Sequence, residues 1–152
     1  MPESRYEHLD DLLTQIRHVR QRPAWRRRLL AVSGTTLSTL RALRAVEQAD
    51  KSGAGASVRD VADYMAVEHS TASRTVAGVV AAGLLSKSSA PGDHRRCELT
   101  LTDVGRKELE QVTARRHEMF TEAIAHWPHS DVDTLIELLE RLVTDLEKGV
   151  GA

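Results

Sequence analysis

One short stretch of the chain concentrates side chains that can hydrogen-bond to nucleic acid. Within HSTASRTVAGVVAAG, hydroxyls, an imidazole and a guanidinium alternate with apolar residues at three- and four-residue spacing. That spacing predicts a helix with one buried side, whose polar side can reach base edges and phosphates. A solvated helix face is the alternative interpretation. The apolar residues are Ala72, Val76, Val79 and Val80, and the polar candidates are His69, Ser70, Thr71, Ser73 and Arg74.

Three further cations, Lys87, Arg95 and Arg96, flank the turn sequence Pro91-Gly92. A cationic hairpin tip can neutralise phosphates or enter the minor groove. Asp93 lies two residues before Arg95, so its carboxylate could brace the tip and direct Arg96 outward. A solvated tip is again the alternative interpretation.

The elements that must position these side chains follow from local rules. Ser57 and Asp60 match a capping box, which predicts that a helix begins there. Residues 66–68 interrupt the helical pattern, and Gly83 suits the left-handed end of the second helix. The apolar stripe of the first helix is Val58, Val61, Ala62 and Met65.

Two strands are expected after Gly83, over residues 84–88 and 97–101. Leu99 and Leu101 alternate with Glu98 and Thr100, which predicts one buried and one wet face. Two helices followed by a hairpin form a helix-turn-helix with a wing. A helix of about 10–12 Å diameter fits a major groove about 12 Å wide, so the predicted function is transcription regulation.

Residues 34–112 resemble the winged-helix core of the MarR family, the multiple antibiotic resistance regulators. The resemblance rests on TTLSTLRALRAV, SVRDVADYM, HSTASRTVAGVVAAGLL, the Asp-x-Arg-Arg pattern in DHRR and the Leu-Thr-x-x-Gly-Arg pattern in LTLTDVGRKEL. One position departs from the family pattern, because Glu68 stands where a serine-like helix cap is usual.

The resemblance implies a homodimer, an inverted-repeat operator in double-stranded DNA, and a small-molecule or oxidant input. The expected fold is mainly α with a small β-hairpin wing, in one unit over residues 1–152. Dimerisation helices are expected over residues 3–22 and 113–148. Repressor action fits this scheme, whereas a winged-helix protein that binds another protein, with weak or no specific DNA binding, is the alternative.

Helical stripes also occur outside the motif. One stops near Pro23, and another ends before the loop at residues 51–55. Thr102 is expected to cap a long helix that Pro128 ends, and Ser130 with Asp133 predicts a further capped helix. Its leucines approximate a heptad seam, which suits either a partner helix or packing within one chain. The stripes are Tyr6, Leu9, Leu12, Leu13, Ile16 and Val19; Leu37, Leu40, Leu43 and Val46; Val104, Leu109, Val112, Phe120, Ala123, Ile124 and Trp127; and Leu135, Leu138, Leu139, Leu142, Val143 and Leu146.

Two regulatory inputs can be placed on residues. By analogy with the family, an effector would lie near Trp25, Leu29 and Leu30, beside basic residues whose more common role is a solvated face. Cys97 admits a redox-responsive alternative, although a lone cysteine is more often a packing residue. The basic residues are Arg22, Arg26, Arg27 and Arg28.

Composition fits one compact domain of 152 residues with 41% hydrophobic content. The net charge of -1 hides an excess of acidic residues after position 96, where 12 Asp/Glu stand against 6 Lys/Arg. Neither an apolar stretch of about 18 residues nor a signal sequence is found, and there is one cysteine, so we expect a cytoplasmic protein without a membrane partner. No catalytic set, metal-ligand spacing or cofactor motif stands out, so an enzyme is not expected.

Overall fold

A computed structural model describes residues 4–53, 55–90 and 92–151; the side chains of residues 90 and 93–96 lie outside this description. The chain divides into two compact units, Met1–Arg116 and His117–Ala152, and each is described by itself. The elements are α1 (Arg5–Gln21), α2 (Pro23–Leu30), α3 (Leu37–Lys51), α4 (Val58–Met65), α5 (His69–Ala81), β1 (Leu85–Ala90), β2 (Asp93–Leu101), α6 (Asp103–Ile124) and α7 (His129–Val150).

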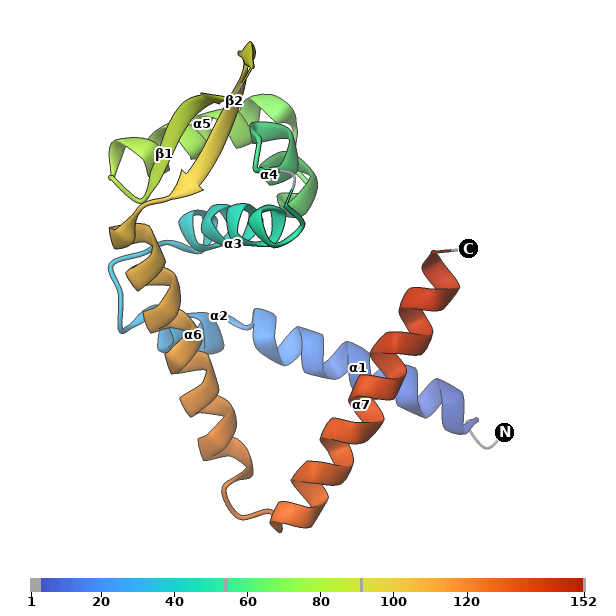
Figure 1. Ribbon diagram of the computed structural model, residues 1–152. Coiled ribbons are helices and arrows are strands. Elements are labelled where there is room, and N and C mark those ends of the chain that lie inside the picture. The colour runs from blue at the N-terminus through green and yellow to red at the C-terminus, as the bar shows by residue number, and fades with distance from the viewer. Residues whose placement is uncertain (1–3, 54, 91, 152) are drawn as a thin grey trace. The chain divides into compact units, whose positions relative to one another are not determined.

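The prediction of a mainly helical fold with a small wing is confirmed, because the described strands form one two-stranded sheet (Figure 1). The short helix α2 was not predicted. Its signal was Pro23 at the first helical position, where the missing N–H of proline costs no hydrogen bond and its fixed φ suits a helix. Among the described residues, no helix is long and apolar enough to cross a membrane.

The core of the first unit is built on α3, against which α4 and α5 pack (Figure 1). The predicted capping box begins α4, since Asp60 N donates to Ser57 Oγ at 3.3 Å and Ser57 N donates to Asp60 Oδ2 at 2.8 Å. Ala66 then takes a left-handed conformation at φ 54°, which turns the chain into α5. The largest fully buried side chains are Leu43, Leu85, Leu99, Val46, Val61, Val76 and Val112.

The wing is an antiparallel pair in which Leu85 faces Leu101 and Lys87 faces Leu99. Leu99 is fully buried, and its N–H donates to the carbonyl of Ala56 at 2.8 Å. This antiparallel bridge pairs β2 with the residue that precedes Ser57. Gly92 has a positive φ of 80° at the turn, and Pro91 lies outside the described residues.

Thr102 caps α6 as predicted, but the inward face of this helix differs from the predicted stripe. Val104 is 56% exposed, and Phe120 and Trp127 are also exposed. The reason is that Gly105, rather than Val104, lies against the backbone of Leu84. Because helix positions three, four or seven residues apart share one face, the buried residues that follow are those in register with Gly105 and not with Val104. The buried residues of α6 are Gly105, Leu109, Val112 and Met119.

The prediction that Ser130 caps the last helix was wrong. Helix α7 begins at His129, with Pro128 at the N-cap position and without a side-chain cap. Ser130 is inside the first turn, where its carbonyl accepts a hydrogen bond from Thr134 Oγ1 at 2.8 Å. The fixed φ of Pro128, at -57°, directs the chain into the helix without the serine.

Candidate nucleic-acid interface

Helix α5 separates an apolar side from a polar side as its sequence predicts. Ala72, Val76 and Val79 are buried, while Val80 is half-buried. Because these residues anchor the helix on the core, the opposite side is presented to solvent. The predicted polar residues there are all exposed: His69, Ser70, Thr71, Ser73 and Arg74.

The two ends of α5 are held differently. At the start, Glu68 takes the N-cap position without a side-chain hydrogen bond, and its exposed carboxylate stands at the end of the helix that favours anions. At the far end, Gly83 has a φ of 79°, and Leu84 N donates to the Val79 carbonyl at 3.1 Å. The predicted glycine stop is therefore confirmed.

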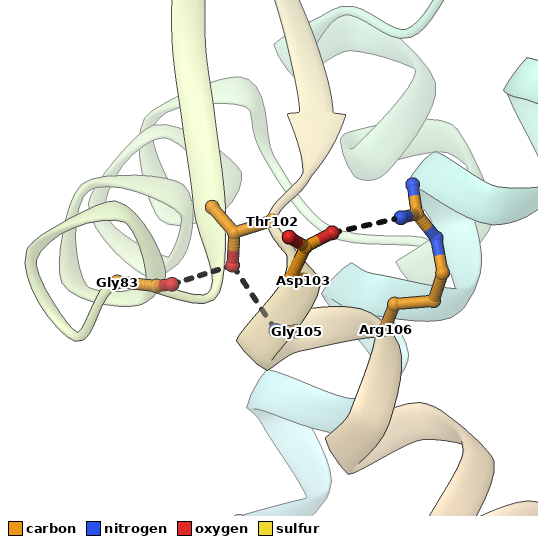
Figure 2. A network of polar contacts seen from close by, with 5 residues as sticks. All are labelled: Gly83, Thr102, Asp103, Gly105 and Arg106. Carbon is orange, nitrogen blue, oxygen red and sulfur yellow. Dashed lines mark hydrogen bonds and ion pairs between the residues drawn. The ribbon is translucent and has the colours of Figure 1, made fainter.

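Thr102 ties the end of α5 to the beginning of α6, as Figure 2 shows. Its Oγ1 donates to the Gly83 carbonyl at 2.6 Å and accepts from Gly105 N at 3.0 Å. Beside it, Arg106 and Asp103 form an exposed ion pair at 3.3 Å. One hydroxyl thus joins the helix-turn-helix to the helix that leaves the wing.

Of the predicted wing cations, Lys87 is exposed on β1. Arg95 and Arg96 are in β2 by their backbone, but their side chains lie outside the described residues. The same holds for Asp93, so its role in bracing the wing stays a prediction. The structure thus brings the polar side of α5 and a strand that carries Lys87 into one compact unit.

Two of the three residues predicted to bind an effector line a cavity, and the third does not. Trp25 and Leu29 line a cavity of about 630 Å³ in the first unit, whereas Leu30 does not line it. The cavity also receives arginines from α1, α3 and α6 that the sequence reading did not single out. Their signal was a spacing of three residues, in Arg17 with Arg20 and in Arg41 with Arg44, which puts each pair on one helix face.

Cys97 is exposed on β2, opposite Ser89. Among the described residues, no three His, Cys, Asp or Glu side chains gather as a metal site.

Comparison with known proteins shows that this chain is similar to transcriptional regulators. Residues 33–96 match the sequence model of the MarR family. The chain is similar to the uncharacterized HTH-type transcriptional regulator YxaD of Bacillus subtilis (strain 168), with 29% identity over 87 residues. This match covers 57% of the chain and 61% of that relative, which is less than two thirds of its length.

Several solved structures share the fold. The transcriptional regulator Tm0710 from Thermotoga maritima has a TM-score of 0.73 at 19% identity, over 96% of this chain and 99% of that one. A MarR family protein from Bacillus stearothermophilus has a TM-score of 0.74 at 16% identity, and the match covers 95% of this chain and 99% of that one. A mutant of MepR from S. aureus, bound to an oligodeoxyribonucleotide, has a TM-score of 0.61 at 17% identity, and the match covers 95% of this chain and 99% of that one.

Proposed function

Because this chain belongs to the MarR family of transcriptional regulators, we propose that it is a homodimeric repressor of inverted-repeat operators whose DNA affinity a small molecule modulates. The observation that carries the proposal is the division of α5. Three of its residues, Ala72, Val76 and Val79, are buried, so its hydroxyls and Arg74 are exposed together. We further propose that the protein acts in the cytoplasm.

The two parts of the interface have different roles in this proposal. Ser73 and Arg74 come early in α5, where the helix would enter the major groove and read base edges. Lys87, Arg95 and Arg96 belong to the wing, which would neutralise phosphates or enter the minor groove. Reading and anchoring therefore reside on separate elements.

The experiment selects an operator from a pool of random duplexes with the purified protein, and then measures affinity for that operator and for a scrambled duplex at several salt concentrations. Arg74→Ala should cost about 1–3 kcal/mol on the operator alone, if its guanidinium contacts a base. Arg95→Ala and Arg96→Ala should weaken binding to both duplexes and reduce the salt slope by about one per lost phosphate contact in each subunit.

Arg141→Ala on α7 is the matched control, because it removes an exposed arginine outside the helix-turn-helix and should leave both affinities unchanged. If no duplex is enriched and affinity does not depend on salt, DNA binding is refuted and the protein-binding alternative gains support. Repression is tested separately, by placing the selected operator in front of a reporter gene. A rise in expression on adding the protein would contradict it.

A further inference from the structure

The turn that joins α4 to α5, residues 66–68, has two features that are unfavourable by themselves. Among the residues that the structure describes, Ala66 is the one non-glycine with a positive φ, at 54°. The Cβ of an alanine crowds the backbone in this conformation, which persists only where the surroundings enforce it. In addition, Glu68 starts α5 without a side-chain cap. The turn therefore needs support from outside its own side chains.

The end of α4 gives part of this support. The last four carbonyls of a helix have no partner within the helix itself. Here Val67 N donates to the Ala62 carbonyl at 3.1 Å. Likewise, Ala66 N donates to the Asp63 carbonyl at 3.3 Å. This pair of bonds closes a helix around one left-handed residue, so both bonds are lost if Ala66 leaves its strained conformation.

Arg41 gives further support from a different helix. It is half-buried on α3, against which α4 packs (Figure 1), and its Nη2 donates to the carbonyl of Met65 at 2.9 Å. Met65 is the last residue of α4, so this carbonyl belongs to the peptide group that leads into Ala66. Because the donor carries a charge, the bond is stronger than one between neutral groups. Arg41 thus restrains the peptide group that must rotate if Ala66 is to change its φ.

We propose that Arg41 is a positioning residue for DNA reading, which fixes the turn between α4 and α5 and so directs Ser73 and Arg74 without touching DNA. The consequence at DNA rests on the proposed function, whereas the hold on the turn does not. Attraction to phosphates tolerates a small rotation of α5, because it depends mainly on charge. Hydrogen bonds to base edges weaken steeply when their angles change. Loss of Arg41 should therefore reduce specific affinity while general affinity remains.

The first test measures affinity of the full chain for the selected operator and for a scrambled duplex at several salt concentrations. Arg41→Met removes the guanidinium at similar length. It should lower operator affinity about tenfold or more, since a hydrogen bond to a charged group is worth roughly that factor. Affinity for the scrambled duplex and the salt slope should stay unchanged, because no phosphate contact is lost.

Two further variants serve as the conservative replacement and the control. Arg41→Lys keeps a charged donor and should retain part of the operator affinity. Lys51→Met removes a cation from the same helix, where the side chain is exposed and pairs with Glu47 at 3.1 Å. This control should change neither affinity.

A substitution within the turn distinguishes positioning from a general loss of stability. Ala66→Gly removes the strain, because glycine takes the left-handed conformation without steric cost. If Arg41 acts by enforcing that conformation, adding Ala66→Gly to Arg41→Met should restore most of the lost operator affinity. An arginine that only stabilises the fold would give the same loss in both backgrounds. The doubly substituted chain also serves as the test protein if Arg41→Met alone does not fold.

Hydrogen exchange tests the hold on the turn without DNA. The amides of Ala66 and Val67 donate the two bonds that close the turn, so Arg41→Met should speed their exchange about tenfold, while amides in the middle of α6 keep their rates.

The proposal is overturned if these two amides exchange as in the wild type, or if they exchange faster while operator affinity stays intact. It is also overturned if Arg41→Met weakens both duplexes equally and lowers the salt slope, which would place Arg41 on a phosphate. A wild-type chain that prefers no duplex refutes the proposed function instead, and the exchange rates then still decide whether Arg41 holds the turn.

Discussion

At the scale of single residues, two glycines in helices have opposite surroundings. A Cβ on Gly105 would lie 2.0 Å from the carbonyl oxygen of Leu84, which is backbone and cannot move aside as a side chain would. A Cβ on Gly78, in the exposed part of α5, would meet nothing within 4 Å. Gly105 therefore permits close packing of the α6 start on the chain before β1, while Gly78 has no packing reason in this structure.

We expect Gly105→Ala to lower the free energy of unfolding by about 1–3 kcal/mol or more, because the backbone must shift to admit the methyl group. Gly78→Ala, its matched control, should raise the same quantity by about 0.5–1 kcal/mol, since alanine loses less backbone entropy in a helix. Urea unfolding of both variants measures the difference. Equal stability of Gly105→Ala and the wild type would contradict the close approach to Leu84.

Single residues also show which contacts can be predicted from the sequence and which cannot. Ser57 with Asp60 and Thr102 were found in advance because their hydrogen bonds join near neighbours in the chain. The contact between Arg41 and Met65 could not be found in that way. It depends on how α3 and α4 pack, and no local rule relates residues 24 positions apart.

At the scale of elements, the polar side of α5 can be predicted from its sequence. The N-terminus of this helix is poorly capped. Glu68 offers no side-chain cap, although its negative charge suits the positive end of the helix dipole. We expect Glu68→Ser to raise the free energy of unfolding by roughly 0.5 kcal/mol, because a serine cap contributes about 1 kcal/mol and the lost charge takes back part of that gain. The same change removes a negative charge beside the proposed phosphates, so affinity for any duplex should rise.

Glu68→Gln separates these two effects. It removes the charge without adding a short capping oxygen, and so should strengthen DNA binding while slightly lowering stability, because the helix start loses a favourable negative charge. Thermal melting and salt titrations with a scrambled duplex measure the two quantities. A Glu68→Ser protein that melts below the wild type would show that Glu68 makes a contact the helix needs.

Element boundaries were predicted best where one residue type decides them. Gly83, Pro23 and the capping box at Ser57 each mark an end that the structure reproduces. The start of α7 was misplaced because Pro128 and Ser130 both suit a helix start, and the proline position prevailed. The stripe of α6 was predicted correctly at Leu109 and Val112 but wrongly at Val104, because periodicity identifies apolar residues, whereas a glycine, Gly105, makes the first inward contact of this helix.

At the scale of the whole molecule, the terminal helices leave much apolar surface uncovered. Helix α7 has no buried residue, and its Leu138 and Leu146 are 52% and 57% exposed. Helix α1 has none either, with Tyr6 exposed and Ile16 more than half exposed. Apolar stripes of this length on two helices exceed what a monomeric protein usually exposes, and they favour burial against a second copy.

We therefore expect two chains in sedimentation at micromolar concentration, and a melting temperature that rises with protein concentration. Leu138→Glu with Leu146→Glu should dissociate the dimer, because each buried leucine contributes about 1.5–3 kcal/mol. Thr144→Glu, on the opposite side of α7, adds the same charge and should leave the dimer intact. A wild-type chain that sediments as a monomer with full helicity would refute the dimer, since α1 and α7 would then keep their helical form without any cover for their leucines.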